Sequence, residues 1–195
     1  MAVALDPGVV GKITEGPTLE YMEEYKAVNE LLGELSRKAA EYLTANGFKA
    51  LPYAATDEGV DSRTHSTELP HKTVATLAGL GWIGKCALLV TERYGSAVRI
   101  GKVLTDATLP VAKPVVESRC EDCTVCVDAC PGGAANGRNW EAGLERNRFF
   151  DAHACRRAAR AKAKERIGIL YAICGMCIAA CPWTRRYIDE AGRSS

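Results

Sequence analysis

Cysteine is the residue type of this chain most suited to chemistry, and eight of the nine cysteines lie within a span of about 60 residues near the C-terminal end. A first group has the spacing C-x2-C-x2-C-x3-C and is followed by Pro131; it consists of Cys120, Cys123, Cys126 and Cys130. A second group lacks the first cysteine of this pattern and is followed by Pro182; it consists of Cys174, Cys177 and Cys181. Cys155, upstream of the second group, can supply the missing ligand. This spacing is typical of chains that hold two 4Fe-4S clusters.

The cysteine that precedes each proline is expected to cross to the other cluster, as in the bacterial ferredoxin run. The set named cluster one therefore comprises Cys120, Cys123, Cys126 and Cys181. The set named cluster two comprises Cys130, Cys155, Cys174 and Cys177. The alternative is a zinc ion in a four-cysteine site, but such sites seldom use a third cysteine at this spacing followed by Cys-Pro.

The ninth cysteine, Cys86, lies far from the others in the sequence. A buried cysteine often acts as a small hydrophobic residue. The functional alternative is a thiol that lines a cavity facing the clusters.

Composition places few limits on the partners, because the net charge of the 195 residues is +1. The cysteine-rich part is more basic, with 13 Lys and Arg against 9 Asp and Glu in residues 119–195. Residues 1–5 are too short for a signal peptide, and this favours a cytoplasmic protein over a secreted disulfide framework. The uncharged run 167–184 contains three cysteines and a proline, so cluster ligation explains it better than a membrane span.

Apolar periodicity predicts a long helix over 19–45, with Thr18 as its N-cap and Asn46-Gly47 as its end. Strands are predicted over 2–5, 48–54, 87–90 and 97–104, and a short helix over 72–78. Residues 7–17 and 55–70 are predicted to be loops, 109–115 a linker, and 186–195 a frayed end.

The segment HKTVATLAGLGWIG, residues 71–84, is followed by Lys85. With Gly95-Ser96, the strand Val98 to Thr105 and both Cys-Pro groups, it resembles epoxyqueuosine reductase and the wider group that includes the cobalamin-dependent reductive dehalogenases. The resemblance covers about residues 2–183 and is weak before residue 70. It implies an α+β fold: a shortened nitroreductase-like α/β domain over 1–115, followed by a bacterial ferredoxin-like domain with two 4Fe-4S clusters over 116–195.

The resemblance also implies an iron–sulfur oxidoreductase, in which electrons pass through the clusters to a cofactor or substrate in the adjoining cleft. That cofactor is expected to be cobalamin, with flavin as the alternative. The cofactor-binding residues expected from the matched segment are Lys72, Gly81, Trp82, Gly84 and Cys86. Lys72 also fits a surface lysine at a helix start, and Trp82 also fits a core anchor beneath a tight turn.

Two features depart from the family. Its N-terminal domain has more chain upstream, so part of the cavity wall is expected to be missing or supplied by a second copy in a homodimer. Its acidic proton donor has no counterpart here, because the matching position holds His65. An imidazole titrates near neutral pH, so His65 is the candidate catalytic acid, and its alternative is a solvated loop histidine.

The basic stretch 156–166 has three interpretations. It can guide a flavodoxin-like or ferredoxin-like redox partner, bind tRNA phosphates, or only offset the charge of the clusters. The functional alternative to an enzyme is a ferredoxin-like electron carrier without a catalytic site of its own.

Overall fold

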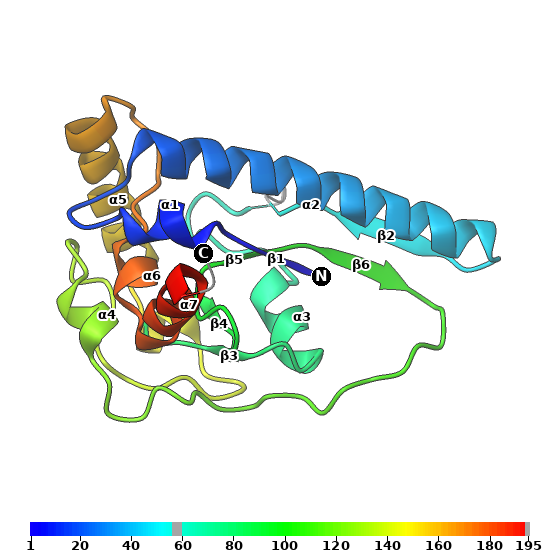
Figure 1. The fold of residues 1–195 in the computed structure, drawn as a ribbon. Helices are drawn as coiled ribbons and strands as arrows, with labels where there is room; N and C mark the ends of the chain where they lie inside the picture. Colours follow the sequence, from blue (N-terminus) through cyan, green and yellow to red (C-terminus); the bar gives the residue numbers. More distant parts are fainter. Residues whose placement is uncertain (56–59, 194–195) are drawn as a thin grey trace.

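The computed structural model describes residues 1–55 and 60–193, which form a mixed arrangement of helices and short strands (Figure 1). The N-terminal part contains β1 (Ala2–Ala4), α1 (Pro7–Gly11), α2 (Leu19–Ala45), β2 (Ala50–Tyr53), α3 (His71–Leu77), β3 (Trp82–Ile83), β4 (Leu89–Val90), β5 (Val98–Ile100) and β6 (Lys102–Thr105). The cysteine-rich part contains α4 (Val125–Asp128), the 3₁₀ helix η1 (Arg146–Arg148), α5 (Ala152–Ile167), α6 (Met176–Ala180) and α7 (Pro182–Arg193).

The long helix α2 has the bounds that its apolar periodicity predicts. The Thr18 hydroxyl accepts a hydrogen bond from the Tyr21 amide at 3.1 Å and so caps its first turn. Met22, Val28 and Leu32 are buried on one face, at the spacing of an amphipathic helix. These three residues belong to the largest hydrophobic core, whereas β2 and β6 run alongside the C-terminal half of α2 (Figure 1).

The strands form three separate antiparallel pairs, β1 with β5, β2 with β6, and β3 with β4. The strand predicted over 97–104 is divided at Gly101, because its two halves pair with different partners. The strand predicted over 87–90 is shorter, since Ala87 has a φ of 57° and begins no strand.

Two predicted irregular segments were wrong, because each contains a helix. Residues 7–17 include α1, where Asp6 accepts from the Val9 amide at 3.0 Å and Pro7 occupies the first turn. Residues 186–193 belong to α7 and do not fray. The buried Thr184 hydroxyl accepts from the Ser96 amide at 3.0 Å, and the Tyr187 hydroxyl donates to the Leu5 carbonyl at 3.0 Å.

The largest hydrophobic core joins the two parts of the chain. Leu5, Val10 and Leu32 from the first part pack with Ala163 and Ile173 from the second. A boundary at residues 115/116 therefore separates two stretches of sequence that share one core. No helix among the described residues has the length and apolar character needed to cross a membrane.

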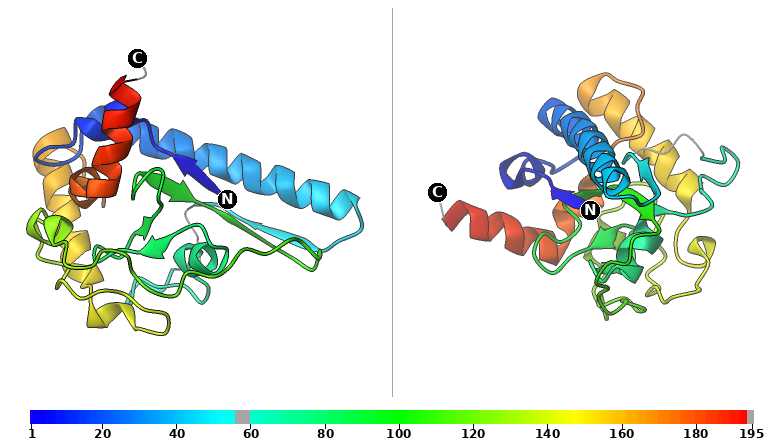
Figure 2. Two further views of the ribbon diagram at one scale, coloured as in Figure 1. Left: turned by 60° about the horizontal axis from the view of Figure 1, so that its bottom comes forward. Right: turned by 90° about the vertical axis from the view of Figure 1, so that its right-hand side faces the viewer.

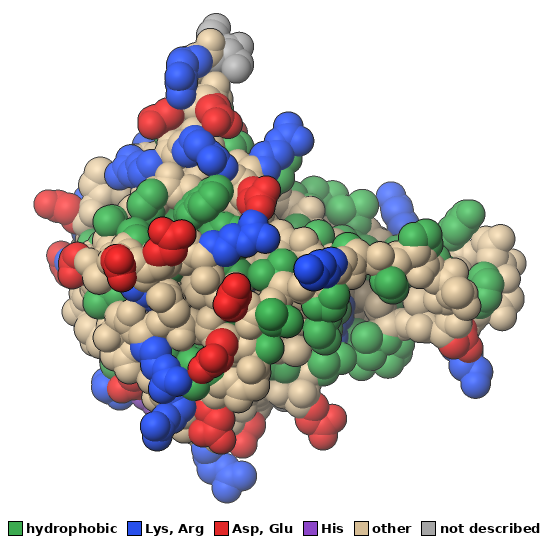
Figure 3. All heavy atoms as spheres, turned by 90° about the horizontal axis from the view of Figure 1, so that it is seen from below, with side chains coloured by type: hydrophobic (Ala, Val, Ile, Leu, Met, Phe, Trp, Pro, Cys, Tyr) green, Lys and Arg blue, Asp and Glu red, His purple; other side chains and the backbone are tan. Residues whose placement is uncertain are grey.

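The C-terminal half of α2, with β2 and β6, extends from the body as an arm (Figures 1 and 2). Acidic and basic side chains are interspersed on the body, whereas hydrophobic side chains are frequent on this arm (Figure 3).

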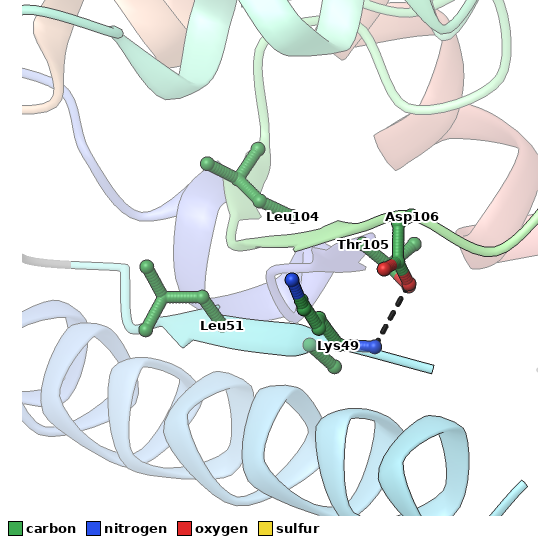
Figure 4. A pocket seen from close by; sticks show the side chains of 6 residues that line it. Lys49, Leu51, Leu104, Thr105 and Asp106 are labelled. Carbon is green, nitrogen blue, oxygen red and sulfur yellow. Dashed lines mark hydrogen bonds between the residues drawn. The ribbon is translucent and has the colours of Figure 1, made fainter. Parts of the chain in front are cut away.

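A shallow hollow of about 370 Å³ lies on the arm and is lined by residues of β2 and β6 (Figure 4). Leu51 and Leu104 are exposed there, and the Asp106 carboxylate accepts a hydrogen bond from the Lys49 amide at 2.8 Å. The arm contains none of the cysteines.

Candidate iron–sulfur centre

The cluster cysteines lie on short helices and on the turns beside them. Cys126 lies in α4 and Cys177 in α6, and these two helices pack against each other. Cys181 ends α6 immediately before α7, and Cys155 lies in the first turn of α5. The four-residue α4 and five-residue α6 bring their cysteines to a common centre that neither helix could form alone.

Sulfur atoms from the two groups are interleaved. Burial raises the pKa of the Cys181 thiol, and charges on Cys120 and Cys126 add to this rise. Burial raises the pKa of Cys155 to about 11, with contributions from Cys130 and Cys174. Each cysteine that precedes a proline therefore lies beside cysteines of the other sequence group.

Backbone amides are directed at both of these crossing cysteines. The Ala134 amide donates to Cys130 Sγ at 3.3 Å. The amides of Thr184 and Trp183 donate toward Cys181 and counter part of the upward pKa shift caused by burial. N–H donors around sulfur are characteristic of iron–sulfur sites, where they tune the reduction potential. The donor set and its amide environment fit two 4Fe-4S clusters.

A zinc ion in a four-cysteine site holds each sulfur at about 2.3 Å, so the ligands converge on one point. Among residues 1–55 and 60–193, no group of three or more Cys, His, Asp or Glu side chains converges in this way. Wider spacing is expected of ligands that bind the corners of a cluster.

Cys86 lies between the two ligand sets. Contact with the Cys126 thiol lowers the pKa of Cys86, whereas contact with Cys177 and burial raise it, and the net shift is strongly upward. The side chain is 5% exposed. Sequence alone did not indicate that this ninth thiol contacts one ligand of each set, because it is separated from them by more than 30 residues.

The Gly-rich turn before Cys86 is packed too closely to leave space around its glycines. A Cβ atom on Gly81 would lie 2.0 Å from the Val90 carbonyl oxygen, and one on Gly84 would lie 2.9 Å from Val90 Cγ2. Gly84 also lies against the sulfurs of Cys120 and Cys86, each 3.7 Å from the same ideal Cβ position. These glycines let the turn approach β4 and the cysteines.

Replacing Gly81 by alanine should destabilise the chain by about 3 kcal/mol, because the added methyl group overlaps backbone that cannot move freely. The midpoint of chemical unfolding under anaerobic conditions measures this loss. Gly33→Ala in α2 is the matched control, since its Cβ meets nothing closer than Ala54 at 3.9 Å and alanine favours a helix. Equal midpoints for Gly81→Ala and the unmodified chain would contradict the packing role.

Trp82 is fully buried in a second apolar cluster, which also contains Cys120 and Cys181. Trp183 meets its ring edge-on at 5.1 Å between centroids, and the Arg119 guanidinium lies over it at 5.4 Å. Its indole nitrogen is buried without a hydrogen-bond acceptor among the described residues. A buried donor without an acceptor reduces the stability of the folded state by about 1–3 kcal/mol. We therefore expect the indole nitrogen to donate to an acceptor that is not a protein atom.

Lys85 is 3% exposed, and sequence analysis gave it no role. Its Nζ donates to the Glu121 carbonyl at 2.8 Å, within the Cys120–Cys123 loop. No carboxylate pairs with it among the described residues, and a buried charge without a counter-charge is costly. The signal that could have identified it is a lysine directly after a buried Gly-rich turn.

His65 and Lys72 lie on the cluster two side. The two imidazoles of His65 and His153 are 4.7 Å apart, and Arg146 donates to the His65 carbonyl at 2.7 Å. Burial lowers the pKa of His65, and nearby His153 and arginines lower it further. Burial lowers the pKa of Lys72 to about 8, and its Nζ donates to the Ala87 carbonyl at 2.6 Å. Sequence analysis did not identify His153 or Arg146.

A hollow of about 480 Å³ opens beside the Gly-rich turn, between β1 and the segment after β4. Gly81, Trp82, Tyr94 and Arg119 contribute to its lining, whereas His65, Lys72 and Cys86 do not. The expected residues therefore lie on two sides of the turn: Trp82 next to the hollow, and His65 with Lys72 next to Cys155.

Comparison with known proteins supports an iron–sulfur centre at these cysteines. Residues 119–184 match the model of a 4Fe-4S double cluster binding domain. The epoxyqueuosine reductase of Bacillus cereus is 40% identical over 78 residues, which cover 40% of this chain and 20% of that protein. The tetrachloroethene reductive dehalogenase of Desulfitobacterium hafniense is 29% identical over 194 residues, 94% of this chain and 31% of that protein. The chain is a relative of the epoxyqueuosine reductases and the reductive dehalogenases. It spans less than half the length of either.

Solved structures agree on the fold. A reductive dehalogenase described in connection with B12-dependent dehalogenation superposes with a TM-score of 0.72 at 18% identity, over 100% of this chain and 27% of that one. An epoxyqueuosine reductase bound to a modified tRNA stem loop superposes with a TM-score of 0.57 at 25% identity, over 80% of this chain and 39% of that one. The mixed helix and strand arrangement is thus that of this group.

Proposed function

We propose that this chain is an iron–sulfur oxidoreductase that passes electrons through cluster one and cluster two to an acceptor bound beside cluster two. The observation that carries the proposal is the position of Cys86, which contacts Cys126 of one ligand set and Cys177 of the other. Because a single thiol reaches both sets, the two clusters would be close enough for electrons to move between them. The relatives are named as reductases, and this supports the transfer of electrons to an acceptor.

The acceptor face is cationic. Lys72 lies near enough to Cys155 and Arg146 for their charges to affect its pKa, and Arg146 and Arg156 act on His65 in the same way. An anionic acceptor would be attracted to these groups. We assign proton donation to His65, whose lowered pKa makes its protonated form a stronger acid and whose half-exposed side chain can be reprotonated from solvent.

The described residues do not enclose a corrin ring. Trp82 and Cys86 are buried and offer no open face for stacking, and the 480 Å³ hollow is the size of a site for a drug-sized ligand. Cobalamin is the first candidate acceptor because of the relatives, with flavin second. Lys72 and His65 are the residues that would meet its edge.

The basic face of α5 adjoins cluster two, because Arg156 and Arg157 directly follow Cys155 and are exposed. No salt bridge involves either of them among the described residues. We assign this face to an acidic electron donor such as a flavodoxin or ferredoxin. The tRNA stem loop bound by the related reductase makes RNA the alternative occupant.

Anaerobic titration with hydroxocobalamin and, separately, with flavin mononucleotide tests the acceptor. We expect saturable binding of one of them and its reduction by the dithionite-reduced protein. Lys72→Met should weaken that binding about tenfold, or about 1.4 kcal/mol, because it removes the charge and keeps the length of the side chain. Lys49→Met on the arm is the matched control and should leave binding unchanged.

The electron-carrier alternative predicts a different pattern. A carrier would hold both clusters and reduce an external protein, yet bind neither hydroxocobalamin nor flavin. That outcome would overturn the acceptor site and leave the clusters in place.

A further inference from the structure

Among the described residues, the turn Gly81–Lys85 contains a buried donor without an acceptor and a buried ammonium group without a counter-charge. The Trp82 indole nitrogen has no acceptor among the described residues, although the ring is 0% exposed. The Lys85 ammonium is 3% exposed and meets a backbone carbonyl but no carboxylate in the described chain. A folded protein rarely leaves a buried donor and a buried charge unmatched side by side.

Both groups lie against the ligands of cluster one. Trp82 packs in the same apolar cluster as Cys120 and Cys181. Lys85 reaches the carbonyl of Glu121, the residue after Cys120, and Glu121 has a φ of 46° that turns the ligand loop at this point. Gly84, between them, approaches the Cys120 sulfur. The turn therefore closes over cluster one.

We propose that the turn Gly81–Lys85 is the tuning element of cluster one, in which Trp82 Nε1 donates a hydrogen bond to a cluster sulfur and Lys85 supplies a positive counter-charge. The assignment rests on the ligand set given above for cluster one. It changes the role of the segment most similar to the family, from cofactor contact to control of a cluster. Trp82 and Lys85 act through the cluster and touch no substrate.

The consequence is a raised reduction potential. A reduced cluster carries one more negative charge than an oxidised one, so a hydrogen bond to sulfur and a nearby cation stabilise the reduced form more. Removing either group should therefore lower the potential of cluster one. The ligands of cluster two have other polar neighbours, the Ala134 amide at Cys130 and Lys72 near Cys155, so the potential of cluster two should be unaffected.

Redox titration of the intact protein, monitored by electron paramagnetic resonance, measures this directly. Trp82→Phe and Lys85→Met should each shift the reduction equilibrium of cluster one about tenfold toward the oxidised form, which corresponds to about 59 mV for one electron. Trp140→Phe is the control for a buried indole in the same apolar cluster. Lys102→Met is the control for a buried lysine, since Lys102 is 3% exposed but donates to the Leu69 carbonyl beside the arm.

A spectroscopic measurement on the unsubstituted protein keeps the proposal testable if a variant loses iron. With ¹⁵N-labelled tryptophan, the reduced cluster one should show a nitrogen hyperfine coupling that persists in Trp140→Phe. Absence of this coupling, or unchanged potentials in Trp82→Phe and Lys85→Met with full iron content, would overturn the proposal. Neither result would affect the proposed acceptor, whereas a protein that holds only one cluster would overturn the ligand assignment itself.

Discussion

Replacing Cys181 by serine should remove cluster one and spare cluster two. The unmodified chain is expected to hold about eight iron and eight sulfide, because eight cysteines match two 4Fe-4S clusters. Cys181 lies with Cys120 and Cys126, although its neighbours in sequence are Cys174 and Cys177. Iron should therefore fall to about four per chain, and the lost electron paramagnetic resonance signal should be that of the cluster held by Cys120, Cys123 and Cys126.

The matched control is Cys86→Ser, which alters a buried thiol between the two sets without removing a proposed ligand. The Cys86→Ser variant should retain about eight iron atoms per chain, because the other eight cysteines are enough to ligate two 4Fe-4S clusters. If Cys181→Ser instead loses the cluster held by Cys174 and Cys177, the crossing is absent. If Cys86→Ser loses half of the iron, Cys86 is a ligand and Cys155 is not.

Removing the iron should unfold the segment from Ala107 to Asp151 while leaving α2 in place. The only helices in this segment are α4, with four residues, and η1, with three. It has few backbone hydrogen bonds of regular structure, so ligation of Cys120, Cys123, Cys126 and Cys130 must supply much of its stability. We expect amide exchange there to accelerate about 1000-fold on anaerobic chelation, equivalent to about 4 kcal/mol of local stability.

Helix α2 provides the internal reference for this experiment. Its C-terminal half packs against β2 and β6, which contain no cluster ligand, whereas its first turns share a core with Ile173 and Ala179 beside the ligands. Its exchange should change far less than that of residues 107–151. Equal acceleration in both regions would indicate global unfolding, and no acceleration in either would show that the segment is held by protein contacts alone.

The sequence by itself determined the features that depend on neighbouring residues. The spacing of Cys120, Cys123 and Cys126 is local, so it indicates an iron–sulfur ligand run wherever that run is placed. The periodicity and N-cap of α2 are equally local, and the helix has the predicted bounds. The prediction for the C-terminal segment was less accurate, because α7 is held by contacts with residues far away in the sequence, of Thr184 with Ser96 and of Tyr187 with Leu5.

Only the tertiary structure decided which distant residues meet. Packing of α4 against α6 brings Cys181 to Cys120 and Cys126, and it places Cys86 between the two ligand sets. Long-range packing also buries Trp82 beside Cys120 and Lys85 against Glu121, whereas the sequence placed Trp82 next to a cofactor. A Gly-rich turn permits close approach to any neighbour, and its sequence does not specify which one. That neighbour is chosen by long-range packing, here β4 and the cysteines of cluster one.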